Sequence, residues 1–258
     1  MIRNLLIVGA SGLALAIVGI GGSLALGGSD LARHSWTWVI DDNSDGVRVT
    51  RDTLPAPVTR QIAWAESTRL AIDLPGDVVI IQDSNAPGIS VTGNADLAER
   101  VVLVDGRLTL DSADRRGNGK SYVVLDKQGL RSIDNGRDLK ITIRAPSLNT
   151  FELFGNSDVE IRGYNQPELN LTLTGNADVE VIGTADKLTV DASGNSSAEL
   201  DELLGRDATI RTSGNAGVKT AANGKVVIVA SGESRVRLTR RPSELQQQLS
   251  QDAEVRQD

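Results

Sequence analysis

The sequence has no cysteine and only one histidine, His34. The absence of cysteine excludes a disulfide framework and a thiol nucleophile. Zinc sites are built from sets of Cys and His ligands, so the same two absences exclude a zinc centre of the usual composition. His34 precedes the repetitive part of the chain, and we expect a solvent-exposed linker residue there, not the base of a Ser-His-Asp triad.

Aromatic residues and positive charge are also scarce. Phe, Trp and Tyr make up 3% of the chain, and 27 Lys and Arg against 34 Asp and Glu give a net charge of -7. A nucleic-acid-binding surface requires a basic patch, so nucleic acid is not an expected partner. The shortage of aromatic rings argues against a carbohydrate groove that binds sugars by stacking.

The one long apolar run lies at the N-terminus. Residues 5–26 carry no charge and follow Arg3. About 20 apolar residues span a bilayer as a helix, and a positive residue before them favours a cytoplasmic N-terminus. Residues 1–28 therefore predict a single-pass inner-membrane anchor with the remaining chain in the periplasm. The alternative is a cleaved signal ending near Ala25-Leu26-Gly27, which would make the protein secreted.

The dominant pattern is a motif that occurs five times, as in FELFGNSDVEI and LTLTGNADVEV. Its glycines are separated by 20, 19, 20 and 18 residues. They are Gly155, Gly175, Gly194, Gly214 and Gly232. Apolar residues recur at every second position around each glycine, which places them on one face of a strand. The period is too short for a strand-helix-strand unit and predicts one turn of a β-solenoid, in which stacked coils bury a continuous core.

The residues at the centre of the motif predict a tight corner. Glycine tolerates a positive φ and the close approach of neighbouring backbone. In four copies the next residue is asparagine, at Asn156, Asn176, Asn195 and Asn215. Amides stacked about 4.8 Å apart can hydrogen-bond as a ladder. We expect a structural ladder, with a ligand site built on it as the alternative.

Two columns of carboxylates are the best chemical candidate in the chain. They are Asp158 and Asp178, three residues past the glycine, and Glu160, Glu180 and Glu199, five residues past it. Like charges about 5 Å apart repel by nearly 1 kcal/mol even in water, and a hard cation such as Ca²⁺ would offset this repulsion. The second column turns basic at Lys219 and Arg237, which favours a solvated charged face over a calcium site.

The chain resembles the GIN-domain family, the head domains of auto-transporter adhesins. The resemblance rests on the LAIDLPGDVVI opening, the LKITIRAPSL segment and the Gly-Asn-Ala/Ser-Asp-Val-Glu repeats, and covers roughly residues 65–240. It implies an all-β, right-handed parallel solenoid in the bacterial envelope. It brings no catalytic residues and no cofactor.

Four segments follow from these patterns. Residues 1–28 are the anchor or signal, residues 29–65 a juxtamembrane linker, residues 66–240 the solenoid and residues 241–258 a polar tail. Trp36 and Trp38 in the linker would either sit at the membrane surface or cap the first coil.

The function predicted from the sequence is a non-enzymatic, adhesin-like binding or scaffolding module with a protein or glycan partner. The alternative is a β-helix protein that binds or cleaves polysaccharides and holds Ca²⁺ on its carboxylate face. The absence of basic residues interleaved with the acidic columns argues against the cleaving version.

Overall fold

The computed structural model describes residues 36–41, 47–50, 57–111, 120–126, 129–133, 139–250 and 252–258. Two compact units divide the chain: Met1–Pro55 with Arg116–Asn135, and Ala56–Arg115 with Gly136–Asp258. The predicted membrane segment, residues 5–26, and His34 lie outside the described residues. Within the described ranges, no helix is long and apolar enough to cross a bilayer.

The first unit contains a four-stranded antiparallel sheet. Strand β1 (Trp36–Asp41) pairs with β2 (Val47–Thr50) on one side and with β9 (Lys120–Asp126) on the other, and β9 pairs with β10 (Gly129–Ile133). Trp36 and Trp38 are therefore strand residues of this sheet. Residues 36–50 were expected within a linker, and the pairing with a segment about 80 positions later is not visible in the local sequence.

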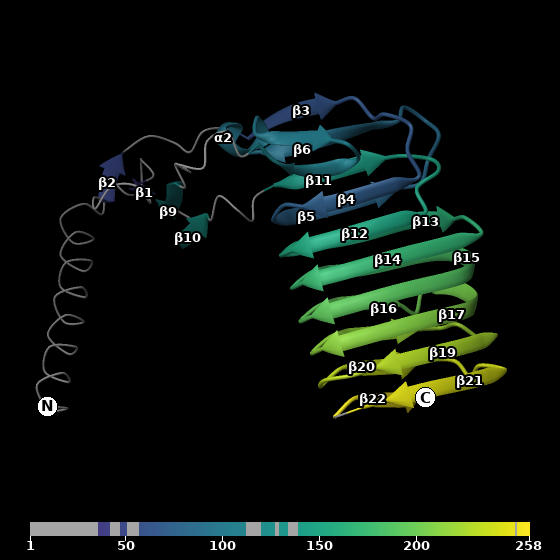
Figure 1. Ribbon diagram of the computed structural model, residues 1–258. Coiled ribbons are helices and arrows are strands. Elements are labelled where there is room, and N and C mark those ends of the chain that lie inside the picture. The colour runs from purple at the N-terminus through teal and green to yellow at the C-terminus, as the bar shows by residue number, and fades with distance from the viewer. Residues whose placement is uncertain are drawn as a thin grey trace, which may run out of the picture. The chain divides into compact units, whose positions relative to one another are not determined.

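The second unit is a stack of parallel coils, each made of one strand before a corner and one strand after it (Figure 1). The repeat glycine stands at five of these corners. The strands before the corner form what we call the leading face. They are β4 (Arg69–Asp73), β12 (Thr150–Gly155), β14 (Glu168–Gly175), the second half of β15 (Asp178–Gly194), β17 (Leu203–Gly214), β19 (Lys225–Ala230) and β21 (Glu244–Leu249).

The strands after the corner form the trailing face. They are β5 (Gly76–Ile81), β13 (Ser157–Asn165), the first half of β15, β16 (Ser197–Leu200), β18 (Gly217–Thr220), β20 (Arg235–Leu238) and β22 (Glu254–Gln257). Because β15 runs without a break from one face to the other, it belongs to both.

Shorter elements cover the N-terminal end of the stack. They are β3 (Val58–Ile62), β6 (Gly88–Gly93), the single-turn helix α2 (Ala95–Ala98), β7 (Val101–Val104), β8 (Arg107–Leu110) and β11 (Lys140–Arg144). Strand β8 pairs with β4, β11 pairs with β5, and β6 and β3 continue the sheet antiparallel beyond β11. A tight turn joins the antiparallel pair β7 and β8, and Asp105 and Gly106 in this turn both have positive φ.

The core is the set of side chains at every second position around the glycine, as the alternation predicts. Phe151 and Ile210 before the glycine and Val159 and Leu200 after it are fully buried. Small residues occupy the position two past the glycine, where the two faces converge on the corner. They are Ser157, Ala177, Ser196, Ala216 and Ser234, all buried. The buried Ser234 hydroxyl lies 2.9 Å from the Thr212 hydroxyl, so both have a hydrogen-bond partner.

The corners stack through the glycine backbone. The N–H of Asn195 donates to the Gly175 carbonyl at 2.7 Å, and the N–H of Asn215 donates to the Gly194 carbonyl at the same distance. Gly194 has a φ of 86°, and a Cβ added there would lie 2.6 Å from the Gly175 oxygen. Glycine is therefore required at this corner both for the left-handed backbone and for the close approach of successive coils.

The structure differs from the sequence prediction at the C-terminal end. Residues 241–258, expected as a polar tail, form one more coil, with β21 paired to β19 and β22 paired to β20. Every residue of β21 is exposed. The backbone ladder extends onto a segment with few apolar residues because the preceding coil offers an in-register edge.

Comparing Gly194→Ala with Gly155→Ala tests how much the close contact of successive corners contributes to stability. For Gly194→Ala we expect a loss of about 3 kcal/mol or more in the free energy of unfolding, since the Cβ adds a backbone clash to the cost of a left-handed alanine. Gly155 has a similar φ of 74° but nothing within 4 Å of an added Cβ. Gly155→Ala should therefore cost only about 1–2 kcal/mol. Equal losses in urea denaturation would show that coil contact at the glycine is unimportant.

Candidate functional site

The first acidic column lies on the outer side of the trailing face. Asp158 and Asp178 are register partners on adjacent coils, and Asp77 of β5 precedes Asp158 in the same column. Ser197 follows Asp178. Asp77 was not identified from the sequence, although its Asp-Val pair matches the Asp-Val of the repeats.

The second acidic column runs beside the first. Glu160 is the register partner of Glu180, and Glu180 of Glu199. The same column continues into basic residues at Lys219, Arg237 and Arg256. The trailing face is therefore acidic over its first coils and basic over its last coils.

Basic side chains next to the columns neutralise some of these carboxylates. Arg162 donates two hydrogen bonds to Glu160, with Nη2 2.6 Å from Oε2. Lys219 Nζ lies 2.8 Å from Asp201, and Arg237 Nη2 lies 3.0 Å from Asp258. Some of the charged residues in the second column are therefore already engaged in ion pairs.

The pKa shifts report the electrostatic balance along the columns. Burial, followed by the charges of Asp158 and Glu199, raises the pKa of Asp178. Burial, and next the neighbouring charge of Glu160, raises the pKa of Glu180. The hydrogen bonds from Arg162 lower the pKa of Glu160 instead. Of these three carboxylates, the folded structure thus favours the ionised form only for Glu160, which a guanidinium reaches.

The columns do not converge on a common point. Among the described residues, no group of three or more His, Cys, Asp or Glu side chains is arranged to hold a metal ion. A cation site on these columns stays a prediction of the sequence.

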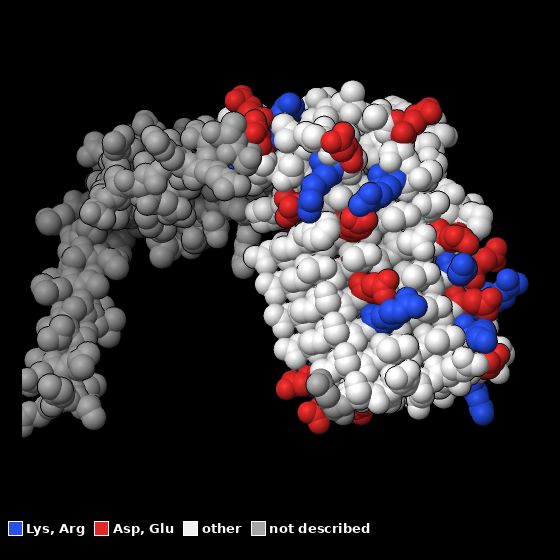
Figure 2. All heavy atoms as spheres, viewed as in Figure 1, with Lys and Arg blue, Asp and Glu red and all other residues white. Residues whose placement is uncertain are grey.

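The leading face has a different chemistry. A row of charged residues crosses the upstream end of β14, β15, β17 and β19; it consists of Glu168, Lys187, Asp207 and Lys225. Past this row the outward side chains are mostly hydroxyls, with two valines on β19, and we call this set the neutral face. The set is Asn170, Thr172, Thr174, Thr189, Ser193, Thr209, Ser213, Val227 and Val229. One pair of charged residues lies between the members of this set, Asp191 and Arg211, 3.5 Å apart. Figure 2 shows the result as a broad, largely uncharged surface over the leading strands.

The asparagine side chains form a ladder along the corner between the two faces. Asn176 donates to Asn156 at 2.8 Å, Asn195 to Asn176 at 3.0 Å and Asn215 to Asn195 at 3.1 Å. The amides therefore satisfy one another along the corner, and no side chain of the series is directed at a separate centre.

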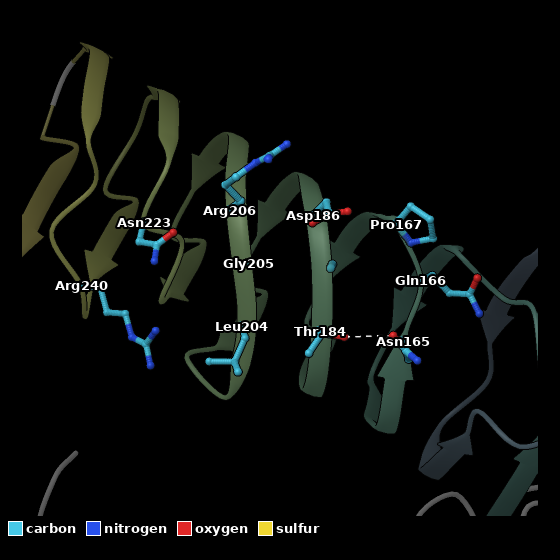
Figure 3. Close-up of a pocket in the computed structure, with 11 residues that line it drawn as sticks. Asn165, Gln166, Pro167, Thr184, Asp186, Leu204, Gly205, Arg206, Asn223 and Arg240 are labelled. Atoms are coloured by element: carbon cyan, nitrogen blue, oxygen red, sulfur yellow. Dashed lines mark hydrogen bonds between the residues drawn. The ribbon is translucent and has the colours of Figure 1, made fainter.

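A shallow groove of about 520 Å³ lies at the opposite corner of the coils. Figure 3 shows Asn165, Thr184 and Leu204 on successive coils, with the Thr184 hydroxyl 3.1 Å from Asn165 Oδ1. Gly205 carries no side chain and leaves part of the groove open beside Ala185. The sequence offered no signal for this groove, because its residues lie between the repeated motifs.

The pKa shifts of Glu180 and Glu160 predict opposite effects of removing each charge. A folded-state pKa above the unfolded value means that ionised Glu180 destabilises the fold, and this penalty disappears as the pH falls below about 4.3. Glu180→Gln should raise the Tm slightly at pH 7 and leave it unchanged near pH 3. Glu160 has a lowered pKa and stabilises the fold above about pH 4.3, so Glu160→Gln should lower the Tm at pH 7. Changes in Tm of the same sign for the two variants at pH 7 would contradict the opposite roles of Glu180 and Glu160.

Comparison with solved structures places the fold among known proteins. A crystal structure of a "putative adhesin" from Bacteroides fragilis NCTC 9343 matches with a TM-score of 0.56 at 15% identity, covering 78% of this chain and 97% of that one. A "putative adhesin" from Parabacteroides merdae ATCC 43184 matches with a TM-score of 0.43 at 13% identity, covering 80% of this chain and 97% of that one. At 15% identity the likeness to the Bacteroides fragilis structure concerns the fold alone.

Comparison with curated protein sequences gives no match. The family model described as "Putative auto-transporter adhesin, head GIN domain" matches residues 68–242, which include most coils of the solenoid and the glycine repeats. The chain therefore belongs to this GIN-domain family.

Proposed function

We propose that the protein is a non-enzymatic, adhesin-like binding module of the bacterial cell envelope, and that the neutral face is its contact surface. The observation that carries the proposal is the contrast between the two faces. The chain has a net charge of -7, yet the neutral face contains only one mutually neutralised ion pair. The centres of protein interfaces are depleted in charged residues, and a rigid sheet presents its side chains without a loss of backbone entropy.

The area of the neutral face limits the affinity with which a single copy of the chain can bind a partner. The neutral face covers β14, β15, β17 and β19, which span roughly 14 Å at ~4.8 Å per spacing and about 20 Å along the chain, so its flat area is roughly 300 Å². A standard interface buries about 800 Å² on each partner. A single solenoid should therefore bind weakly, and many copies on one surface should bind strongly through avidity.

The place in the envelope rests on the family and on the uncharged run at residues 5–26. We propose that this run anchors the chain in the inner membrane with the solenoid in the periplasm, and that cleavage of the run would release it. The right-handed sense of the coils is part of the same family-based proposal.

A multivalent binding assay tests the neutral face. Beads coated with the full chain should adhere to a panel of envelope proteins and glycans, and Thr172→Lys with Thr209→Lys should reduce the retained beads at least about tenfold by placing two unpaired charges in the contact. Ser197→Lys on the trailing face is the matched control and should retain wild-type adhesion. Equal adhesion of all three proteins would remove the neutral face from the proposal.

A calcium-binding carboxylate face is the second candidate. The in-register stacking of Glu160, Glu180 and Glu199 favours it. Thermal melting of the full chain in calcium and in chelator decides the matter. A calcium-dependent rise in Tm that Glu180→Lys abolishes would establish the site, whereas identical melting curves would leave the columns as a solvated face.

A further inference from the structure

Among the described residues, the coil formed by β21 and β22 has an open edge (Figure 1). In the described part of the chain, β21 pairs only with β19 and β22 only with β20. The N–H groups of Glu244, Ser250 and Glu254 donate to the preceding coil. Backbone groups alternate in direction along a strand, so those of the intervening residues point out of the stack. These residues are Leu245, Gln247, Leu249, Ala253, Val255 and Gln257.

The open edge also exposes part of the core. Leu245 and Leu249 continue the buried columns of β19, since they are register partners of Val226 and Ala230. Nevertheless they remain 37% and 39% exposed. An edge strand with unpaired backbone groups and exposed leucines is a template for the addition of another strand.

The sequence of β21 is self-complementary. Leu245-Gln246-Gln247-Gln248-Leu249 reads the same in both directions. An antiparallel second copy centred on Gln247 places Leu245 against Leu249 of that copy and Gln246 against its Gln248. The backbone of Gln247 points out of the stack, so this register also forms the hydrogen-bonded pairs that an antiparallel ladder requires.

Strand β22 is self-complementary about Val255. An antiparallel copy centred there places Glu254 against Arg256 of the second copy, which pairs opposite charges on the outer side. Val255 meets its own copy on the core side. Asp252 would face Asp258, but Arg237 already holds the Asp258 carboxylate at 3.0 Å.

The two centres are aligned across the core. Gln247 is the register partner of Ile228, and Val255 is the register partner of Val236. Ile228 lies four residues before Gly232 and Val236 four residues after it, so both are equally far from the corner. One twofold axis perpendicular to both faces can therefore pass through Gln247 and Val255 and pair both strands at once.

We propose that the β21–β22 coil is a homodimerisation surface on which two copies of the chain pair edge to edge about this twofold axis. The pairing covers the exposed leucines, satisfies the open backbone groups and joins the leading faces of the two copies into one sheet. It is independent of the proposed function, although it would double the length of the neutral face.

Single-cysteine cross-linking tests the axis directly, because the chain has no other cysteine. In the full chain, Gln247→Cys should form a disulfide with its own copy under mild oxidation. Residues in a hydrogen-bonded antiparallel pair have Cα atoms about 5.5 Å apart, within the disulfide range of about 4.4–6.8 Å. Val229→Cys is the control, since Val229 is 41% exposed but lies on β19, away from the axis. Equal cross-linking of the two variants would overturn the proposal.

A charge swap tests the register. Arg256→Glu in the Gln247→Cys background places like charges opposite each other twice and should reduce disulfide formation about tenfold. The double swap Glu254→Arg with Arg256→Glu should restore it while keeping the ion pair within the strand. Thermal melting of each variant checks that the coil still folds. Cross-linking unaffected by Arg256→Glu, or not restored by the double swap, would exclude this twofold arrangement.

Discussion

The close contact of successive corners is the constraint on which the solenoid depends. Each coil must return to the same position above the glycine of the coil before it, because the N–H that follows the glycine bonds to the preceding glycine carbonyl. A side chain at Gly194 or Gly214 would enter the space of that carbonyl. The spacing of the glycines therefore sets the coil length, and the coil length places equivalent residues of every coil in one column.

A residue type that recurs at the same position of successive coils forms a continuous feature along the solenoid. An apolar residue repeated in a column becomes a continuous core, an asparagine becomes a ladder of amides, and a glutamate becomes a stack of like charges. The fold tolerates the stack of glutamates because Arg162 binds Glu160. In later coils Lys219, Arg237 and Arg256 take the place of the carboxylates. On the neutral face this repulsion does not arise, because most of its side chains are hydroxyls and stacked hydroxyls carry no net charge.

The regular part of the fold could be predicted from the sequence because its information is local. Alternation with period two identifies Phe151, Val179 and Leu200 as core residues, and all three are buried. The rest depends on distant pairing. Strand β1 forms with β9, and β21 forms on the edge of β19, although four of the six residues of β21 are polar. The stacking of Glu160 on Glu180 follows from the repeat, whereas the corner groove beside Gly205 arises from residues that do not repeat.

The direction of the interstrand hydrogen bonds gives the solenoid an anisotropic resistance to force. In every coil these bonds run along the axis of the stack, from the N–H of one strand to the carbonyl of the strand below. A load applied along that axis opens the coils one after another, so each step breaks only the bonds of one coil. A load applied along the strands shears all the bonds of a strand together and meets a much greater resistance. A partner that pulls across the neutral face in the direction of the strands would thus be held more firmly than one that pulls on the end of the stack.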